Sequence, residues 1–143
     1  NITVVRICST EMLHAYGFLA KIFEIFGKYK ISVDIVSTSE VTVSVTLDNI
    51  NGTSKNFENA ISELRNIANV EVLNERAIVC ITGKDIKNKP KILERIFNVF
   101  DKINVNTEII SQGVSPLSIS FVVKQENADN VIKELHKELF ENE

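Results

Sequence analysis

Two copies of one pattern follow each other along this chain, and this duplication limits the possible folds more than any other feature. At an offset of 74 residues the sequence matches itself without gaps from Val5 to Leu47. A period of this length exceeds the roughly 20–50 residues of solenoid repeats, so it predicts two small domains, residues 1–75 and 76–143. The matched pairs include Val5 with Val79, Phe23 with Phe97, Phe26 with Phe100, Ile35 with Ile109, Ser37 with Ser111 and Ser44 with Ser118.

Each copy alternates between the period of a strand and the period of a helix. In the first copy, apolar residues recur at helical spacing from Phe18 to Tyr29, and they alternate with hydroxyl residues from Val41 to Asp48. We expect the hydroxyl residues to line an exposed face. The expected elements are strands at 2–8, 32–38 and 41–48, a turn at 49–52, helices at 18–29 and 57–68, and a last strand that opens at 70–72. The order βαββαβ is the ferredoxin-like split unit.

The second copy repeats this order but ends early. Pro90 suits the first turn of its first helix, because the missing N–H of proline has no partner there in any case. The expected elements are strands at 78–82, 105–111 and 117–123, a helix from 90 and a helix through 131–139. Too few residues follow Phe140 for a closing strand. We therefore expect an α+β fold of two tandem ferredoxin-like units with antiparallel sheets and helices on one face. The closing strand of the second unit is expected upstream of Asn1 in a longer parent chain.

Composition argues against a membrane span and against nucleic acid. The chain has 44 % apolar and 24 % charged residues, and no run approaches the ~20 apolar residues of a spanning helix. The exposed strand positions of the expected sheets carry hydroxyl groups rather than the aromatic rings on which RNA bases stack. The basic cluster also lacks aromatic neighbours; it consists of Lys84, Lys87, Lys89 and Lys91.

The residues of catalytic and metal chemistry are sparse. Cys8 and Cys80 lie inside strand patterns, so we expect buried thiols in a reducing cytoplasm. His14 and His136 lie far apart in sequence and have few potential ligands nearby, so no metal site is expected. No nucleophile accompanies a base, and no acid and base form an evident pair. These absences favour a ligand-binding function.

The loop that leads into the first helix is the best candidate for a binding site. Gly17, Phe18 and Leu19 stand where the helix begins, so their N–H groups can hold a carboxylate. Asp34 and Glu40 add two carboxylates nearby in the expected fold. One anion site beside two carboxylates suits an amino acid. Taken singly, Gly17 is also explained as a loop glycine and the two carboxylates as solvated surface groups, so the combination carries the hypothesis.

The same residues carry a resemblance to a known family. The first half resembles the first ACT domain of aspartate kinases, and the second half, with Ile110-Ser111-Gln112-Gly113 and Ile119-Ser120-Phe121-Val122-Val123, resembles their second ACT domain. The resemblance covers essentially the whole chain. In the first half it rests on Met12-Leu13-His14, Gly17-Phe18-Leu19-Ala20, Ile31-Ser32-Val33-Asp34 and Thr38-Ser39-Glu40-Val41.

The resemblance implies a feedback site for L-lysine, with threonine as a possible second effector. It assigns the α-ammonium to Asp34 and the carboxylate to the N–H groups of Gly17, Phe18 and Leu19. Ser32 and Val33 belong to the same set. The lysine side chain is assigned to Met12, His14, Thr38, Ser39 and Glu40. The second copy has Glu108 in place of Asp34 and Gln112-Gly113 in place of Thr38-Ser39, so we expect it to bind no ligand.

The resemblance also implies partners. The chain is expected to be the regulatory region of an enzyme that phosphorylates L-aspartate, with ATP and Mg bound by a kinase domain that lies outside this chain and no cofactor within it. Two chains are expected to form a cytoplasmic homodimer through their first ACT units, with the effector at the seam. Two other hypotheses remain open: a free-standing tandem ACT module that regulates another protein, and a small enzyme.

Overall fold

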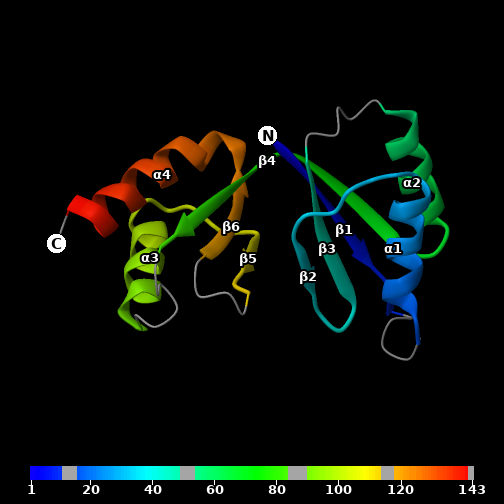
Figure 1. The fold of residues 1–143 in the computed structure, drawn as a ribbon, viewed down its shortest axis with the longest axis horizontal. Coiled ribbons are helices and arrows are strands. Elements are labelled where there is room, and N and C mark those ends of the chain that lie inside the picture. Colours follow the sequence, from blue (N-terminus) through cyan, green and yellow to red (C-terminus); the bar gives the residue numbers. More distant parts are fainter. Residues whose placement is uncertain (11–15, 49–53, 84–89, 114–117, 142–143) are drawn as a thin grey trace. The chain divides into compact units, whose positions relative to one another are not determined.

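The computed structural model describes residues 1–10, 16–48, 54–83, 90–113 and 118–141, so the turn expected at 49–52 lies outside the described residues. The chain divides into two compact units, Asn1–Asn74 and Glu75–Glu143 (Figure 1). We call these unit 1 and unit 2.

Unit 1 has the βαββαβ order expected from the sequence. Its strands lie in the order β2-β3-β1-β4. Both helices cover one face of this sheet, and the described strands β1, β2 and β3 pair antiparallel (Figure 1). The elements are β1 (Ile2–Cys8), α1 (Phe18–Lys28), β2 (Val36–Thr38), β3 (Thr42–Asp48), α2 (Lys55–Arg65) and the first part of β4 (Asn69–Thr82). The α+β fold class is therefore confirmed.

The core of unit 1 forms between the helices and one face of the sheet. The buried residues of α1 are Phe18, Ile22, Ile25 and Phe26, whose spacing places them on one side of a helix. They pack against a strand face that includes Val45. Burying such side chains contributes about 1.5–3 kcal/mol each. The apolar spacing in the sequence therefore fixes which face of α1 meets the sheet.

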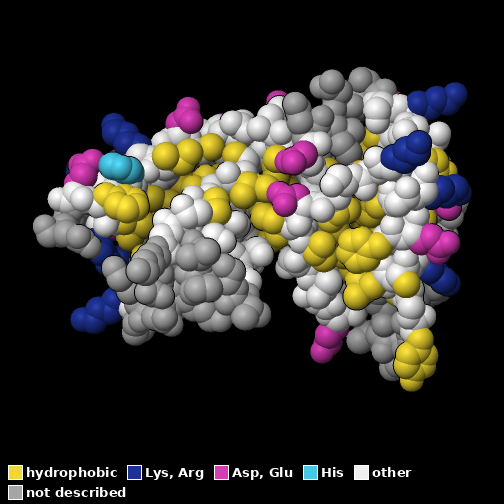
Figure 2. Space-filling model, in the orientation of Figure 1, with side chains coloured by type: hydrophobic (Ala, Val, Ile, Leu, Met, Phe, Trp, Pro, Cys, Tyr) yellow, Lys and Arg dark blue, Asp and Glu magenta, His cyan; other side chains and the backbone are white. Residues whose placement is uncertain are grey.

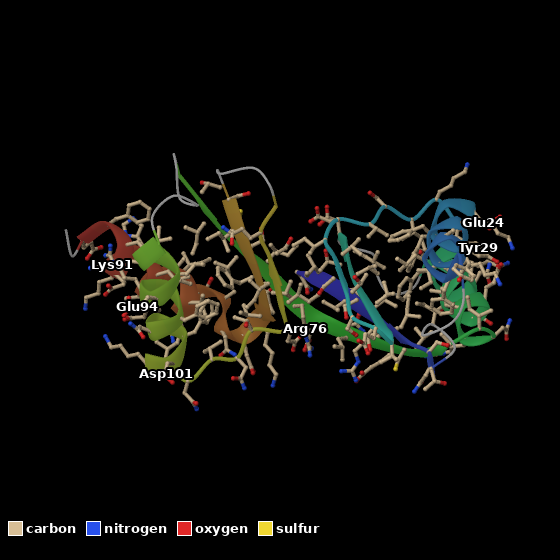
Figure 3. All side chains as sticks on the ribbon, turned by 90° about the horizontal axis from the view of Figure 1, so that it is seen from below. Glu24, Tyr29, Arg76, Lys91, Glu94 and Asp101 are labelled. Carbon is tan, nitrogen blue, oxygen red and sulfur yellow. The ribbon has the colours of Figure 1, made fainter. Side chains whose placement is uncertain are left out.

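A cluster of three polar side chains joins the end of α1 to α2. Lys28 Nζ and the Tyr29 hydroxyl each donate a hydrogen bond of 2.7 Å to Glu63 Oε2 (Tyr29 is labelled in Figure 3). The two hydrogen bonds, from Lys28 and then Tyr29, lower the pKa of Glu63. The same contacts raise the pKa of Lys28 and of Tyr29. The cluster connects the two helices at the surface and so helps to fix the position of α1.

We expect the Glu63 cluster to give unit 1 an acid-sensitive contribution to stability. Because the pKa of Glu63 is lowered by folding, its contribution is present near neutral pH and is lost as the pH falls through the lowered value. Glu63→Gln should therefore lower the urea midpoint at pH 7, and the difference from the parent chain should vanish in acid. Glu58→Gln, which changes an exposed carboxylate of the same helix, is the control. An equal deficit of Glu63→Gln at both pH values would contradict this.

Unit 2 repeats the first five elements of unit 1. Its strands lie in the order β4-β6-β5. Among the described residues, no strand follows α4 and η4. Its core includes Phe121, whose ring lies 5.1 Å from that of Phe100 between centroids. The elements are the second part of β4, α3 (Pro90–Lys102), β5 (Ile109–Ser111), β6 (Ser118–Lys124), η3 (Gln125–Asn127), α4 (Ala128–His136) and η4 (Lys137–Glu141).

The strand registers correct the gap-free alignment of the two copies. Cys8 pairs with Thr42 in unit 1, and Thr82 pairs with Ser118 in unit 2. The first strands are thus 74 residues apart, but the third strands are 76 apart. Ser44 therefore corresponds to Ser120, and its match with Ser118 is wrong. The second copy holds two extra residues between β5 and β6, and an even insertion preserves the alternation of faces that guided the alignment.

Two strands expected as separate form one. The strands expected at 70–72 and 78–82 are joined in β4, Asn69–Thr82. Glu75, the first residue of unit 2, has φ of 59° within this strand, a backbone conformation that non-glycine residues seldom adopt. The chain therefore passes from one unit to the other inside a strand.

The cysteines lie on the sheet faces that point away from the helices. Cys8 is half-buried and Cys80 is exposed, and both are free thiols. The core side of these strands is taken by Ile7 in β1 and by Val79 and Ile81 in β4. Alternation then sends each cysteine to the other face. The expectation of buried thiols is wrong for this reason.

Candidate effector site

Asp34 stands on a bulge opposite β3. Its N–H donates to the Thr46 carbonyl at 3.0 Å, and the Thr46 N–H donates to the Ile35 carbonyl at 2.9 Å. The Ile35 N–H donates to Thr46 Oγ1 at 2.8 Å. Two residues of one segment thus oppose one residue of β3, which is the count of a β-bulge, a device that often re-aims side chains at binding sites.

The bulge explains two departures from the expected structure. The strand expected at 32–38 is reduced to Val36–Thr38, because the regular ladder stops where the Thr46 hydroxyl takes the Ile35 N–H. Thr46 was expected on an exposed hydroxyl face, but it is fully buried. Its neighbours Thr42 and Ser44 on that face are half-buried. The buried hydroxyl is satisfied by the backbone, as burial of a polar group requires.

The Asp34 carboxylate is available to a ligand. The residue is exposed, and among the residues that the structure describes its side chain has no hydrogen-bond or ion-pair partner. Ser32 is also exposed, whereas Val33 is half-buried against the core of unit 1. An ammonium group placed beside Asp34 would form a charge-assisted hydrogen bond, roughly twice as strong as a neutral one.

The start of α1 offers N–H groups to an anion. Gly17 precedes the helix with φ of 79°, a conformation for which glycine is strongly preferred, and no side chain caps the helix. The first turn also holds no acidic residue. The side chain of Phe18 is buried in the core and holds the start of the helix in place. The side chain of Leu19 is exposed. The backbone N–H groups here lack intrahelical partners and suit a carboxylate. Met12 and His14 lie outside the described residues.

The turn between β2 and β3 lies beside the end of β1. The Ser39 N–H donates to the Thr42 carbonyl at 2.8 Å, and the Ser9 N–H donates to the Val41 carbonyl at 2.9 Å. Thr38, Ser39 and Glu40 are all exposed. Figure 1 shows this turn, the end of β1 and the start of α1 at the same end of unit 1. The structure therefore brings two of the three expected parts of the site together.

Asp34 is set apart from these two parts. It opposes Thr46, whose partner on β1 is Val4, whereas the turn lies level with the pair of Cys8 and Thr42. Four residues along a strand correspond to about 13 Å. Asp34 and the Ser39–Glu40 turn therefore stand at opposite ends of β2, a separation that the residue pattern alone does not predict.

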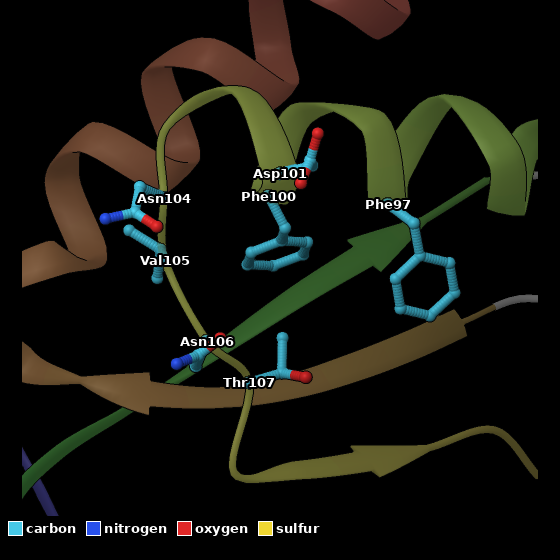
Figure 4. Close-up of a pocket in the computed structure, with 7 residues that line it drawn as sticks. All are labelled: Phe97, Phe100, Asp101, Asn104, Val105, Asn106 and Thr107. Atoms are coloured by element: carbon cyan, nitrogen blue, oxygen red, sulfur yellow. The ribbon is translucent and has the colours of Figure 1, made fainter.

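A pocket of about 360 Å³ lies in unit 2 and contains none of the expected site residues. The rings of Phe97 and Phe100 point from α3 toward the sheet, and the Asp101 carboxylate points away from them (Figure 4). Sequence spacing does not predict this pocket, because most of its polar groups come from the segment that connects α3 to β5. It is lined by Phe97, Phe100, Asp101, Asn104, Val105, Asn106 and Thr107.

The described part of the chain contains neither a metal-binding cluster nor a membrane-spanning helix. No group of three or more His, Cys, Asp and Glu side chains in that part of the chain is arranged to hold a metal ion. Among the same residues, no helix has the length and apolar character to cross a membrane.

Unit 2 matches a known family of domains. Residues 79–139 match the family model of the ACT domain. Unit 1 shares its order of elements and its bulge with unit 2: Glu108 N–H donates to the Val122 carbonyl as Asp34 N–H does to that of Thr46. The fold is thus that of two ACT-like units.

Relatives that match nearly the whole chain identify the family. A chain from Porphyromonas gingivalis W83, assigned as a C-terminal regulatory domain of aspartate kinase, is 35 % identical with a TM-score of 0.80, over 97 % of this chain and 91 % of that one. E. coli aspartokinase III in complex with lysine and aspartate, in its T-state, is 35 % identical with a TM-score of 0.82, over 98 % of this chain and 31 % of that one. The chain belongs to the aspartokinase family and corresponds to its regulatory region.

The curated relatives are much longer than this chain. Aspartokinase 2, chloroplastic, of Arabidopsis thaliana is 40 % identical over 150 residues, which cover all of this chain and 27 % of that protein. The chain thus spans about a quarter of the length of this relative. The resemblance found in the sequence is confirmed, and the match is to the regulatory part of these enzymes.

Proposed function

We propose that unit 1 binds L-lysine and that this binding regulates the kinase domain of an aspartokinase. The observation that carries the proposal is the exposed Asp34 carboxylate, held on a bulge and without a partner among the described residues, in a chain of this family. The E. coli relative whose structure contains lysine lends support.

Each part of the site has a role in this proposal. Asp34 binds an ammonium group, and the N–H groups at Gly17, Phe18 and Leu19 bind the carboxylate. The remaining expected residues contact the rest of the ligand; they are Met12, His14, Ser32, Val33, Thr38, Ser39 and Glu40.

A homodimer would complete the site. β2 lies at the edge of its sheet, so its outer N–H and C=O groups are open to pairing. Antiparallel pairing of β2 with its copy brings Asp34 of one protomer beside the Ser39–Glu40 turn of its partner. This removes the separation of about 13 Å along one strand. The effector would then lie at the seam between two first units.

Exposed apolar side chains support this seam. Leu19, Phe23 and Val36 are 41 %, 38 % and 42 % exposed, although large apolar residues are normally buried. They come from α1 and β2, the two elements that border the edge of the sheet. Figure 2 shows hydrophobic side chains gathered on the surface of unit 1 over β2, β3 and α1. A two-fold interface uses the same surface patch on both protomers. Leu19, Phe23 and Val36 would form that patch.

Regulation requires that the ligand prefer one state of the dimer. A ligand shifts an equilibrium only by its difference in affinity between the two states. A shift from 1:99 to 99:1 needs about 5.5 kcal/mol, which two equivalent sites can share. We propose that the kinase domain of the parent chain, which would bind ATP and Mg and phosphorylate L-aspartate, is the element that responds.

The open edge of unit 2 is a second feature that fits a longer parent chain. A groove of about 230 Å³ runs between β4 and α4 with η4; its lining is Val79, Cys80, Ile81, Thr82, Ile132, Leu135, His136, Leu139 and Phe140. In unit 1 the corresponding place beside β1 is filled by β4. We propose that a strand from upstream of Asn1 fills the groove.

Adding the upstream segment should stabilise unit 2. We expect the melting temperature to rise, because a closing strand pairs the edge of β4 and covers Ile132 and Phe140; each kcal/mol gained corresponds to about 4–8 °C in a domain of this size. A segment of the same composition in scrambled order is the control. An extended chain that melts no higher than the parent would refute this proposal.

Calorimetric titration with L-lysine, L-threonine and L-methionine tests the proposed function. We expect L-lysine to bind in the μM to mM range, about −8 to −4 kcal/mol, as suits a metabolite sensor. Absence of heat with lysine, in a chain shown to be folded by circular dichroism, would contradict the proposal.

A further inference from the structure

Unit 2 has a direct counterpart of the Asp34 site. The Glu108 N–H donates to the Val122 carbonyl at 2.8 Å, as Asp34 does to Thr46. Ile109 pairs with the same Val122, so two residues again oppose one. Glu108 therefore occupies the bulge position of unit 2, and its carboxylate is the counterpart of the Asp34 carboxylate.

The Glu108 carboxylate, unlike that of Asp34, is already bound by an arginine. Arg76 Nε donates to Glu108 Oε1 at 3.1 Å and to Oε2 at 2.9 Å, and Arg76 Nη2 donates to Oε1 at 2.9 Å. Both carboxylate oxygens are thus engaged by one guanidinium, the strongest common geometry of an ion pair. Arg76 is labelled on β4 in Figure 3.

This ion pair is less exposed to solvent than an ordinary surface pair. The side chains of Arg76 and Glu108 are 17 % and 25 % exposed, whereas those of the surface pair Arg6 and Glu71 are 55 % and 48 % exposed. Screening by water and salt is therefore weaker at Glu108 than at an ordinary surface pair. A free ammonium ligand cannot displace such a partner easily, because the arginine is held at high effective concentration by its own strand.

The strand registers show what unit 1 has in place of Arg76. In the strand register, Arg76 on β4 lies opposite Lys124 on β6, and Ile2 on β1 lies opposite Asp48 on β3. The two residues hold the same place in the two units, since the third strands correspond at the offset of 76 described above. The side chain of Ile2 has no hydrogen-bond donor, so it cannot bind the Asp34 carboxylate as Arg76 binds that of Glu108.

We propose that Arg76 determines which unit binds the effector, because its guanidinium occupies in unit 2 the place that the ligand's ammonium takes in unit 1. This inference rests on the proposed function of unit 1. It makes Arg76 a specificity-determining residue. A single amino-acid site per chain follows, because the guanidinium of Arg76 replaces the ligand's ammonium group in unit 2. An ion pair that only stabilises unit 2 would make no such difference to binding.

The test moves the site from one unit to the other. L-lysine is titrated into the parent chain, Asp34→Ala, and the double variant Asp34→Ala with Arg76→Met; methionine keeps the unbranched stem of arginine without its donors. We expect one site per chain in the parent and at least thirtyfold weaker binding in Asp34→Ala. In the double variant we expect one site per chain to return. Arg6→Met in the Asp34→Ala background is the matched control and should restore nothing, because Arg6 pairs with Glu71.

Amide resonances identify the unit that responds. In the parent chain, lysine should shift the N–H signals of Asp34 and Thr46; in the double variant it should shift those of Glu108 and Val122. A folded double variant that binds no lysine, or that binds it without shifts at Glu108 and Val122, overturns the inference while leaving the proposed function of unit 1 intact. A parent chain that binds no lysine overturns both.

A reciprocal variant decides the case if the double variant does not fold. Ile2→Arg places a guanidinium at the matching position of unit 1, with Asp34 unchanged. We expect it to weaken lysine binding at least tenfold, and Ile2→Met, which adds no charge, to leave binding within twofold of the parent. Full lysine affinity in a folded Ile2→Arg variant would overturn the inference.

Discussion

Replacing Asp34 with alanine is expected to weaken lysine binding about thirtyfold to several thousandfold, which corresponds to a loss of about 2–5 kcal/mol. The loss is large because the ligand's ammonium would enter a dimer seam without the carboxylate that compensates its desolvation. Asp34 is exposed in the described chain and has no partner there, so its removal should leave stability nearly unchanged. The effect should therefore appear in affinity and not in the melting temperature.

Asp101→Ala is the matched control for this prediction. It makes the same chemical change at the carboxylate that borders the pocket of unit 2. Calorimetric titration should give parental lysine affinity for Asp101→Ala and strongly reduced affinity for Asp34→Ala. The reverse result would transfer the site from unit 1 to the pocket between α3 and β5, and unchanged affinity in both variants would remove both candidates.

Phe121→Ala should produce the largest loss of stability, about 3–5 kcal/mol, because it leaves a cavity in a close-packed core. Phe121 is fully buried, and its ring contacts those of Phe97 and Phe100, with centroids 6.2 and 5.1 Å away. Phe97→Ala is the control, since Phe97 is 43 % exposed. It should cost less than half as much, mainly through the lost edge contact with Phe121, about 0.5–1.5 kcal/mol.

Two optical signals separate the units in this experiment. The chain has no tryptophan and two tyrosines, Tyr16 and Tyr29, both in unit 1. Tyrosine fluorescence therefore follows unit 1, while far-ultraviolet circular dichroism follows both units. In Phe121→Ala the dichroism transition should move to lower urea concentration. A midpoint unchanged from that of the parent would contradict the packing described for unit 2.

The architecture was predictable because it depends on periodicity, and the copies keep theirs. The helical spacing of Phe18, Ile22, Ile25 and Phe26 predicts both α1 and its buried face, which the structure confirms. The alignment failed between β5 and β6 because an insertion of two residues leaves the alternation of a strand unchanged. Periodicity therefore identifies elements well and their exact correspondence less well.

The sequence predicts residues for a candidate site, and their geometry comes only from the structure. Sequence alone identified Asp34 and the start of α1 as groups suited to an amino acid. It did not reveal the bulge, in which Asp34 and Ile35 both oppose Thr46. Nor did it reveal that Arg76 binds Glu108, because these residues are distant in sequence and meet only through the sheet. Contacts of this kind leave no local signal.

The continuous strand β4 has a consequence for how such a chain can evolve. Asn69–Thr82 supplies the last strand of the first copy and the first strand of the second, with only the unusual backbone of Glu75 between them. No linker within these residues offers a place where a recombination event could separate two intact copies. The duplication is therefore expected to be inherited as a whole, so that the two units remain together even if only one of them binds an amino acid.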